Sequence, residues 1–266
     1  MRRAQSREFT FHALTLIGAI LLVHTIYVMA VRPRADWILA EQAARMQSEP
    51  DFVQPRSVWV IVRDFEQEAC FILMLWAMAI MGYKGVVTGR EGRLVMERFI
   101  PITEGTRILP EDAREYARRI QSLPPAEQDR LLPRSLLASL HRFTATRSIQ
   151  DVSATAHGLC EAESERLESE LSMVRYISWA IPSIGFIGTV RGIGDALGQA
   201  HKAVEGEIAG VTQSLGVAFN STFIALLISI VLMFLLHQLQ LRQERLVLDT
   251  RTYLDEHLIR HLQVPV

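Results

Sequence analysis

Three features are scarce in this sequence, and each scarcity excludes a class of function. Net charge is almost absent, because 28 Lys and Arg residues face 29 Asp and Glu residues and leave a formal charge of −1. A nucleic-acid partner would need a concentrated basic surface, so none is expected. Nucleotide motifs are missing as well, since the glycine-rich run 185–194 lacks the Gly-Lys-Ser/Thr ending of a phosphate loop. No pairing of a nucleophile with a base indicates an enzyme.

Long apolar runs, by contrast, are abundant. Hydrophobic residues make up 49% of the chain and the mean hydropathy is +0.17, which is high for a soluble protein. Between Glu8 and Arg32 the only acidic or basic residues are His12 and His24. This first run is therefore long enough to cross a hydrocarbon core of roughly 30 Å.

Three further runs complete the set. The run 69–83 is short for a span, but Lys84 can extend its amine to the interface and the uncharged residues 85–89 lengthen it. The run 173–200 holds charges only near its ends, and 208–236 holds none. The sequence therefore predicts an all-α integral membrane protein with four transmembrane helices, the last two extended into long cytoplasmic helices.

The distribution of Lys and Arg orients these spans. Most basic residues fall before the first span, between the second and third, and after the fourth. The positive-inside rule places such segments, and with them both termini, in the cytoplasm. The predicted order is the N-terminus and first span (1–31), a periplasmic loop (32–68), the second span (69–89), a cytoplasmic helical domain (90–172), the third span (173–198), a short periplasmic loop (199–207), the fourth span (208–236) and a cytoplasmic C-terminal helix (237–266).

The cytoplasmic parts are predicted to be helical. Pro110 and Pro125 are each followed by acidic residues, a pattern typical of the first turn of a helix. Leu239, Leu246 and Tyr253 recur at seven-residue spacing beyond the fourth span, which indicates that its helix continues into the tail.

The cysteines and the C-terminal histidines predict neither a disulfide nor a metal site. Cys70 lies at the outer end of the second span and Cys160 in the cytoplasmic part, so the two thiols cannot pair within one chain. His257 and His261 are four residues apart on a predicted helix, but two ligands are too few for a metal site. We expect no metal and no cofactor.

Small residues form a stripe along each of the last two spans. Such stripes permit close backbone approach between helices in lipid, so both spans are expected to pack against other helices. At mid-membrane depth the third span adds Thr189, and the fourth adds Asn220, Ser221 and Thr222. The stripes are Ser178, Pro182, Gly185, Thr189, Gly192 and Ala196, and Ser214, Ala218, Ser221, Ala225 and Ser229.

Packing alone explains small residues, but a polar group on each of two neighbouring helices also favours an ion pathway. Neutral hydroxyls and amides can solvate an ion or the carboxylate of a partner, although they cannot carry charge themselves. No acid lies at the middle of any span, because Asp195 and Glu207 are near the outer mouth and are expected to be solvated there. The titrating group would have to come from another chain.

Two motifs carry a resemblance to a known family. The stretch Pro-Ser-Ile-Gly-Phe-Ile-Gly-Thr-Val-Arg-Gly-Ile-Gly (182–194) resembles the Pro-x-x-Gly-x-x-Gly-Thr-Val-x-Gly-Ile channel motif of the MotA/TolQ/ExbB proton channel family. Leu-Gly-Val-Ala-Phe-Asn-Ser-Thr-Phe-Ile-Ala-Leu (215–226) is similar to the family's following helix. The resemblance covers roughly 148–262. Spans one and two match only in number and are expected to be peripheral, lipid-facing support.

The resemblance implies an A-type subunit of an ion-driven motor in the bacterial inner membrane. It implies a homo-oligomer, a pentamer, around two copies of a single-span MotB/ExbD/TolR-like subunit that carries a membrane aspartate. Thr189 matches the threonine that faces this aspartate, and Ser221 or Thr222 matches the polar position of the next helix. The ion implied is H⁺, with Na⁺ as the alternative. Pro182, Gly185, Gly188 and Gly192 would then serve helix packing and a hinge.

Two departures from the family pattern remove titratable groups. Asn220 stands where relatives commonly have aspartate, and Gln213 where many have glutamate near the outer end. Together with Asp195, Gln213 is assigned to the outer mouth. These replacements argue against a proton relay on this chain itself.

Two other classes of function fit parts of the sequence. A structural scaffold or sensor could dock a cytoplasmic partner on the long helices, with Thr189 bonding only within the bundle. A secondary transporter would be expected to show inverted repeats and a broken helix, and neither is visible.

Overall fold

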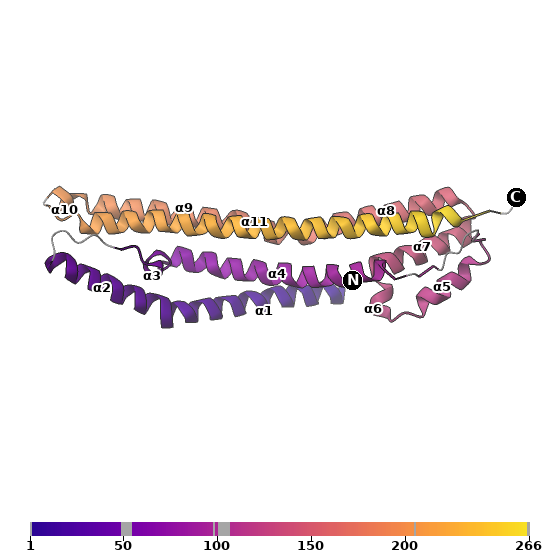
Figure 1. The fold of residues 1–266 in the computed structure, drawn as a ribbon, viewed down its shortest axis with the longest axis horizontal. Coiled ribbons are helices and arrows are strands. Elements are labelled where there is room, and N and C mark those ends of the chain that lie inside the picture. The colour runs from indigo at the N-terminus through magenta and orange to yellow at the C-terminus, as the bar shows by residue number, and fades with distance from the viewer. Residues whose placement is uncertain (1, 49–54, 98, 101–106, 205, 265–266) are drawn as a thin grey trace. The chain divides into compact units, whose positions relative to one another are not determined.

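The computed structural model describes residues 2–48, 55–97, 99–100, 107–204 and 206–264. Within these ranges the chain is helical throughout apart from short connections and one isolated β-bridge between Ile108 and Leu262 (Figure 1). The chain forms two compact units from segments that are distant in the sequence. The first combines Met1–Gly82 with Met173–Leu236, and the second combines Tyr83–Ser172 with His237–Val266.

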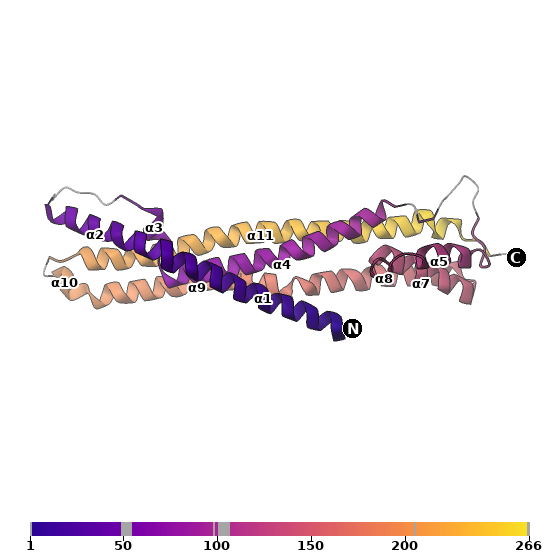
Figure 2. The ribbon, with the colours of Figure 1, turned by 90° about the horizontal axis from the view of Figure 1, so that it is seen from below.

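The first unit consists almost entirely of long helices. Its N-terminal helix passes through a π-helical turn without interruption, and α9 lies beside α11 (Figures 1 and 2). The elements are α1 (Arg2–Ile26), the π-helical η1 (Tyr27–Val31), α2 (Arg32–Ser48), α3 (Val58–Ile61), the first part of α4 (Phe65–Val95), α9 (Ser172–Gly198), α10 (Ala200–Val204) and the first part of α11 (Ala209–His257).

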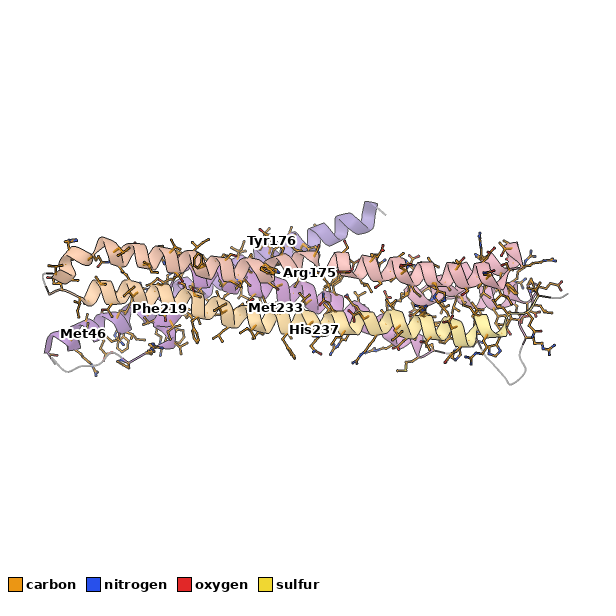
Figure 3. All side chains as sticks on the ribbon, turned by 90° about the horizontal axis from the view of Figure 1, so that it is seen from above. Met46, Arg175, Tyr176, Phe219, Met233 and His237 are labelled. Atoms are coloured by element: carbon orange, nitrogen blue, oxygen red, sulfur yellow. The ribbon has the colours of Figure 1, made fainter. Side chains whose placement is uncertain are left out.

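Among the described residues, three helical segments are long and apolar enough to cross a membrane: Thr10–Met46, Phe65–Val95 and Ala209–His261. Exposed apolar side chains such as Tyr176, Phe219 and Met233, labelled in Figure 3, cover the outside of the first unit. In water such a surface would be unfavourable, whereas lipid solvates it. The chain is an integral membrane protein.

The sequence predicts four spans, and α9 does not reach the same apolarity as the other three. Its 27 residues include Pro182 and several serines and glycines, which contribute little hydropathy. Arg175 and Arg191 lie within it as well. Three of these glycines, Gly185, Gly188 and Gly192, lie against α11.

Glycines bring the backbones of α9 and α11 together. A Cβ atom added at Gly192 would lie 2.7 Å from the backbone nitrogen of Ala218, and one added at Gly188 would lie 2.5 Å from the Cβ of Ser221. At Gly185 it would collide with Ala225. The two small-residue stripes predicted from the sequence therefore face each other, and side chains at these glycines would force the helices apart.

Pro182 adds a bond between the same two helices. A proline has no backbone N–H, so the carbonyl four residues earlier, at Ser178, loses its normal partner within the helix. The Ser229 hydroxyl of α11 donates to this carbonyl at 3.2 Å. Both Ser178 and Ser229 are buried, so the hydrogen bond removes an unsatisfied polar group from an apolar environment.

The second unit has an apolar core of its own. Its elements are the end of α4, α5 (Ala113–Gln121), α6 (Pro125–Gln128), α7 (Leu131–Thr146), α8 (Ile149–Glu170), the end of α11 and the 3₁₀ turn η2 (Ile259–His261). Leu136, Leu140 and Phe143 of α7 are fully buried and pack with Val152 of α8 and Leu254 of α11. The short helix predicted at Pro125 is present as α6. The helix predicted to start at Pro110 is present as α5, but it starts at Ala113, because residues 110–112 form a turn and Asp112 occupies the N-cap position.

Local signals define the hairpin between α7 and α8. Arg147 adopts a left-handed conformation with φ 52° and ends α7, as the residue after a helix often does. Ser148 then caps α8, because its hydroxyl accepts a hydrogen bond from the Asp151 backbone N–H at 3.2 Å. At the other end of the unit, Lys84 of α4 donates to Glu170 at 2.6 Å.

The glycine contacts generate a prediction about stability. Gly192→Leu should destabilise the first unit by about 1–3 kcal/mol, because the added side chain overpacks against α11. Gly194→Leu is the matched control on the same helix, since nothing lies within 4 Å of a Cβ added there. The measurement is the thermal midpoint of each variant in detergent. Equal midpoints for the two variants would show that close backbone approach at Gly192 is unimportant.

Candidate functional site

The threonine hydroxyls of α9 and α11 form a pair inside the first unit. Thr189 Oγ1 and Thr222 Oγ1 are in hydrogen-bond contact. Thr189 Oγ1 also lies 3.0 Å from the Ala218 carbonyl oxygen, and Thr222 Oγ1 lies 3.1 Å from the Gly185 carbonyl oxygen. Gly185 thus permits the close approach and supplies an acceptor to the site.

Two protons serve this pair, and both are used within the chain. In one arrangement Thr189 donates to Thr222, which donates to the Gly185 carbonyl. In the other, Thr222 donates to Thr189, which donates to the Ala218 carbonyl. In either arrangement the pair offers lone pairs outward and no proton. Such a site suits a hydrogen-bond donor, such as a protonated carboxyl group or a water molecule, and it can also ligate a cation.

Ser221 and Gln67 form a second polar contact one residue along α11. The Ser221 hydroxyl donates to the Val217 carbonyl at 2.8 Å and accepts from Gln67 Nε2 at 3.4 Å. Gln67 is fully buried, and its Nε2 atom donates to the Ile61 carbonyl as well, at 3.1 Å. Its Oε1 atom is buried without a hydrogen-bond partner among the described residues. Helix α4 therefore reaches the polar face of α11.

An ion pair ties α4 to α9 close to the threonines. Arg191 Nε lies 2.7 Å from Glu66 Oε1, and its Nη2 atom lies 2.8 Å from Glu66 Oε2. This two-point contact is the strongest geometry for an Arg–carboxylate pair. Asp195 lies 3.8 Å from the same guanidinium group and is more exposed than Glu66. Arg191 follows Thr189 by two residues, so the pair fixes α9 next to the hydroxyl site.

Glu68 continues the pattern toward the N-terminal helices. Its carboxylate binds Arg32 of α2 and accepts from, or pairs with, His24 Nδ1 of α1 at 2.7 Å. The consecutive residues Glu66, Gln67 and Glu68 therefore contact α9, α11 and the α1–α2 helix in turn. The first turn of α4 holds the helices of this unit together.

The remaining predicted residues lie around this centre. Asn220 is partly exposed and makes no side-chain hydrogen bond within the described ranges. Gln213 and Asp195 are exposed near the ends of their helices, and Asp195 faces Arg191. Pro182 lies on α9, seven residues before Thr189. The described part of the chain holds no cluster of three or more His, Cys, Asp or Glu side chains that could bind a metal ion, and both cysteines are free and buried.

Comparison with protein families decides what kind of protein carries this site. Residues 127–252 match the model of the MotA/TolQ/ExbB proton channel family. Over these residues the chain is a member of that family. The matched region includes α7, α8, α9 and most of α11, and so both threonines. No curated protein and no solved structure matches the chain.

Family membership places the site in a membrane channel subunit and not in an enzyme. The family is one of proton channels, and membership implies partnering with subunits of the MotB/ExbD/TolR type. The first turn of α4 lies outside the matched region, so the family relationship does not account for Glu66, Gln67 or Glu68. These are functional candidates that the sequence interpretation missed.

A signal for these residues exists in the sequence. Glu66 and Glu68 immediately precede an apolar run, where acidic residues usually complement the N-terminal end of the helix dipole. Because this ordinary explanation is sufficient, the pattern does not reveal that each side chain binds another helix. Only the arrangement of the four helices shows it.

The Glu66–Arg191 pair leads to a second prediction. Glu66→Gln should destabilise the first unit by roughly 1.5–3 kcal/mol, because Arg191 loses a charged, two-point partner. Asp195→Asn is the matched control, since it removes the more distant and more exposed carboxylate from the same arginine. Thermal midpoints in detergent give the comparison. A larger loss for Asp195→Asn than for Glu66→Gln would contradict the assigned pairing.

Proposed function

We propose that this chain is the A-type subunit of an ion-driven membrane motor, which uses the ion-motive force together with a single-span B-type subunit to generate rotation or force. The observation that carries the proposal is the Thr189–Thr222 hydroxyl pair, formed between two packed helices of a proton channel family member. The pair offers lone pairs without offering a charge.

The acid that carries the proton comes from the partner. Residues 176–190 of α9 and 209–236 of α11 include no acidic or basic side chain. A carboxyl group of the B-type subunit, desolvated between helices, is favoured in its neutral form. Its O–H can then donate to the threonine pair. Release of this proton toward an inner water path lets the carboxylate move on to the next site.

The energy for each step comes from the membrane potential. One elementary charge gains about 2.3 kcal/mol per 100 mV crossed. Protons are the proposed ion, with Na⁺ as the alternative, because hydroxyl lone pairs can ligate either. We propose a pentamer of this chain around two B-type subunits, in the bacterial inner membrane.

Helix α9 is proposed as the fourth span. Its 27 residues correspond to about 40 Å of helix, enough to cross the hydrocarbon core. Trp179, Phe186 and Leu197 are 73%, 64% and 70% exposed on its outer side, which water would not favour. With four spans, both termini lie in the cytoplasm.

Impermeant thiol labelling tests this topology. Glu207→Cys and Arg118→Cys place single exposed thiols after α9 and on α5. In intact cells Glu207→Cys should be labelled and Arg118→Cys should not, because four spans put these positions on opposite sides. Permeabilised cells, in which both should react, provide the control. Equal labelling of both positions in intact cells would contradict the proposal, because it would place Glu207 and Arg118 on the same side of the membrane.

Ion flux tests the role of the hydroxyl pair. Thr189→Val keeps the shape of the side chain but removes its oxygen. Ion flux through vesicles containing this chain and its B-type subunit should therefore fall at least tenfold, which corresponds to a barrier about 1.4 kcal/mol higher. Thr189→Ser should retain most of the flux. Thr212→Val is the matched control, since Thr212 is exposed and its hydroxyl bonds only to the carbonyl of Ile208, the residue immediately before α11.

The same experiment separates the motor from a scaffold or sensor that docks a cytoplasmic partner. A scaffold requires the bundle but no flux. If Thr189→Val conducts like the parent with its complex intact, the hydroxyl pair serves packing alone and the motor proposal fails.

A further inference from the structure

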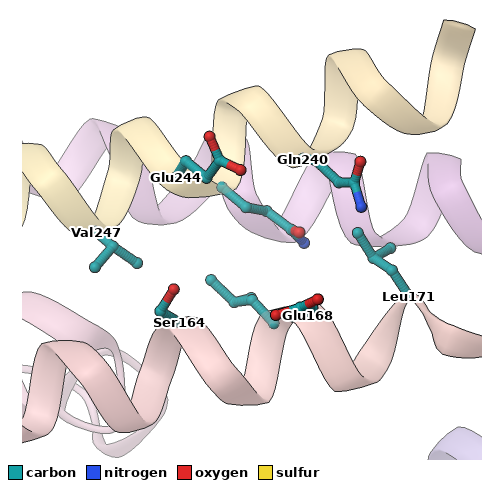
Figure 4. Close-up of a pocket in the computed structure, with 8 residues that line it drawn as sticks. Ser164, Glu168, Leu171, Gln240, Glu244 and Val247 are labelled. Atoms are coloured by element: carbon teal, nitrogen blue, oxygen red, sulfur yellow. The ribbon is translucent and has the colours of Figure 1, made fainter.

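A polar cavity lies between α8 and α11 in the second unit. It has a volume of about 190 Å³. Figure 4 shows Leu171 near Gln240 at one end and Ser164 near Val247 at the other, so the helices run antiparallel past the cavity. The lining residues are Ser164, Leu167 and Glu168 of α8, Leu171 directly after it, and Gln240, Gln243, Glu244 and Val247 of α11. We call this cavity the acidic groove.

The groove interrupts a seam that is otherwise apolar. Its lining residues recur three and four positions apart on both helices, the spacing of a helix–helix seam that normally holds apolar side chains. Farther along the unit the core holds Ala156 and Cys160 of α8 with Leu254 of α11. Polar residues at seam positions reduce the apolar area that the two helices bury against each other.

The groove has unused capacity for hydrogen bonds and charge. Gln243 is 4% exposed, and its Nε2 atom is buried without a partner among the described residues. Rotation of this amide can present its oxygen to the cavity instead. Glu244 is exposed at the groove and has no ion-pair partner within the described part of the chain. With Gln243 and Glu244 together, the groove is suited to a cation that donates several hydrogen bonds.

The opposite face of α11 carries such cations. At about 100° per residue, Arg242 and Arg245 lie on the side of the helix away from Gln240, Gln243 and Glu244. Both arginines are exposed, and neither has an ion-pair partner in the ranges that the structure describes. Leu248, which lies between Glu244 and Arg245 around the helix, is 60% exposed. Arginine is enriched at protein interfaces relative to the rest of the surface.

We propose that the acidic groove of one copy of this chain receives Arg242 and Arg245 from α11 of a neighbouring copy. Each copy then presents its groove to one neighbour and its arginine face to the other, a head-to-tail contact that can close into a ring. The planar guanidinium group donates in a fork that matches the Glu244 carboxylate and the Gln243 amide. This inference rests on the homo-oligomer in the proposed function and assigns the surface that holds its cytoplasmic part together.

Asp249 lies on the arginine face as well and is exposed. Its carboxylate lowers the net charge of that face without pairing with Arg245 four residues earlier. The two arginines therefore remain available to a partner.

Cross-linking between differently tagged copies tests the contact. One copy carries Glu244→Cys, the other carries Arg242→Cys, and both are co-expressed with the B-type subunit in membranes. A short bifunctional thiol reagent should give a covalent dimer carrying both tags. Copies with Glu244→Cys alone, or Arg242→Cys alone, should give none, because a head-to-tail contact does not bring identical positions together.

The native thiols do not interfere with this assay. Burial raises the pKa of the Cys160 thiol, so it stays protonated and reacts slowly at neutral pH. Cys70 is fully buried. The parent chain treated with the same reagent is the control for both.

Charge reversal gives an independent measurement on the same complex. Glu244→Arg should shift the detergent-solubilised complex toward monomer in native mass spectrometry, and adding Arg242→Glu and Arg245→Glu should restore the oligomer. Arg118→Glu, an exposed arginine on α5, should leave the oligomer unchanged. Rescue separates a pairing across copies from a fold damaged by the first change.

The outcomes distinguish this inference from the proposed function. An intact oligomer with no mixed cross-link and no rescue overturns the groove contact and leaves the motor proposal standing. Cross-links between identical positions also overturn it, because they indicate a two-fold contact. A parent chain that is monomeric in the presence of its B-type subunit contradicts both.

Discussion

The close approach of α9 to α11 is the constraint on which the rest of the membrane unit depends. Gly185, Gly188 and Gly192 leave no side chain between the two backbones, so hydroxyls of one helix reach carbonyls of the other. Apolar side chains are solvated by lipid as well as by another helix, so the hydrophobic effect does not drive the two helices together. Close backbone packing and interhelical hydrogen bonds stabilise their contact instead. The Thr189–Thr222 pair exists only because the helix axes are this near.

The first turn of α4 adds a second layer of constraint. Glu66, Gln67 and Glu68 each bind a different neighbour, so the position of α4 fixes the positions of the others. Charged and amide groups are expensive in a membrane protein and persist where partners satisfy them. Helix α4, which contains the second predicted span, therefore supports the site directly, whereas the sequence interpretation treated that span as peripheral.

Much of this architecture could be predicted from the sequence, because its causes are local. Apolar runs define long helices, Pro125 begins a short one, and small residues at three- and four-residue spacing mark the faces of α9 and α11. Family membership follows from the motifs around Thr189 and Asn220. The contacts of Gln67 could not be predicted, because they depend on how distant segments meet. The same holds for the acidic groove, whose lining comes from two helices that are about 70 to 80 positions apart in the sequence.

The fate of the Ser178 carbonyl has a mechanical consequence. In most helices a proline leaves a flexible point, because the carbonyl that it deprives of a partner has nothing to hold it. Here Ser229 of the neighbouring helix supplies the missing donor. Bending α9 at Pro182 must stretch a bond to α11, so the two helices transmit a tilt to each other as a coupled lever and do not flex independently.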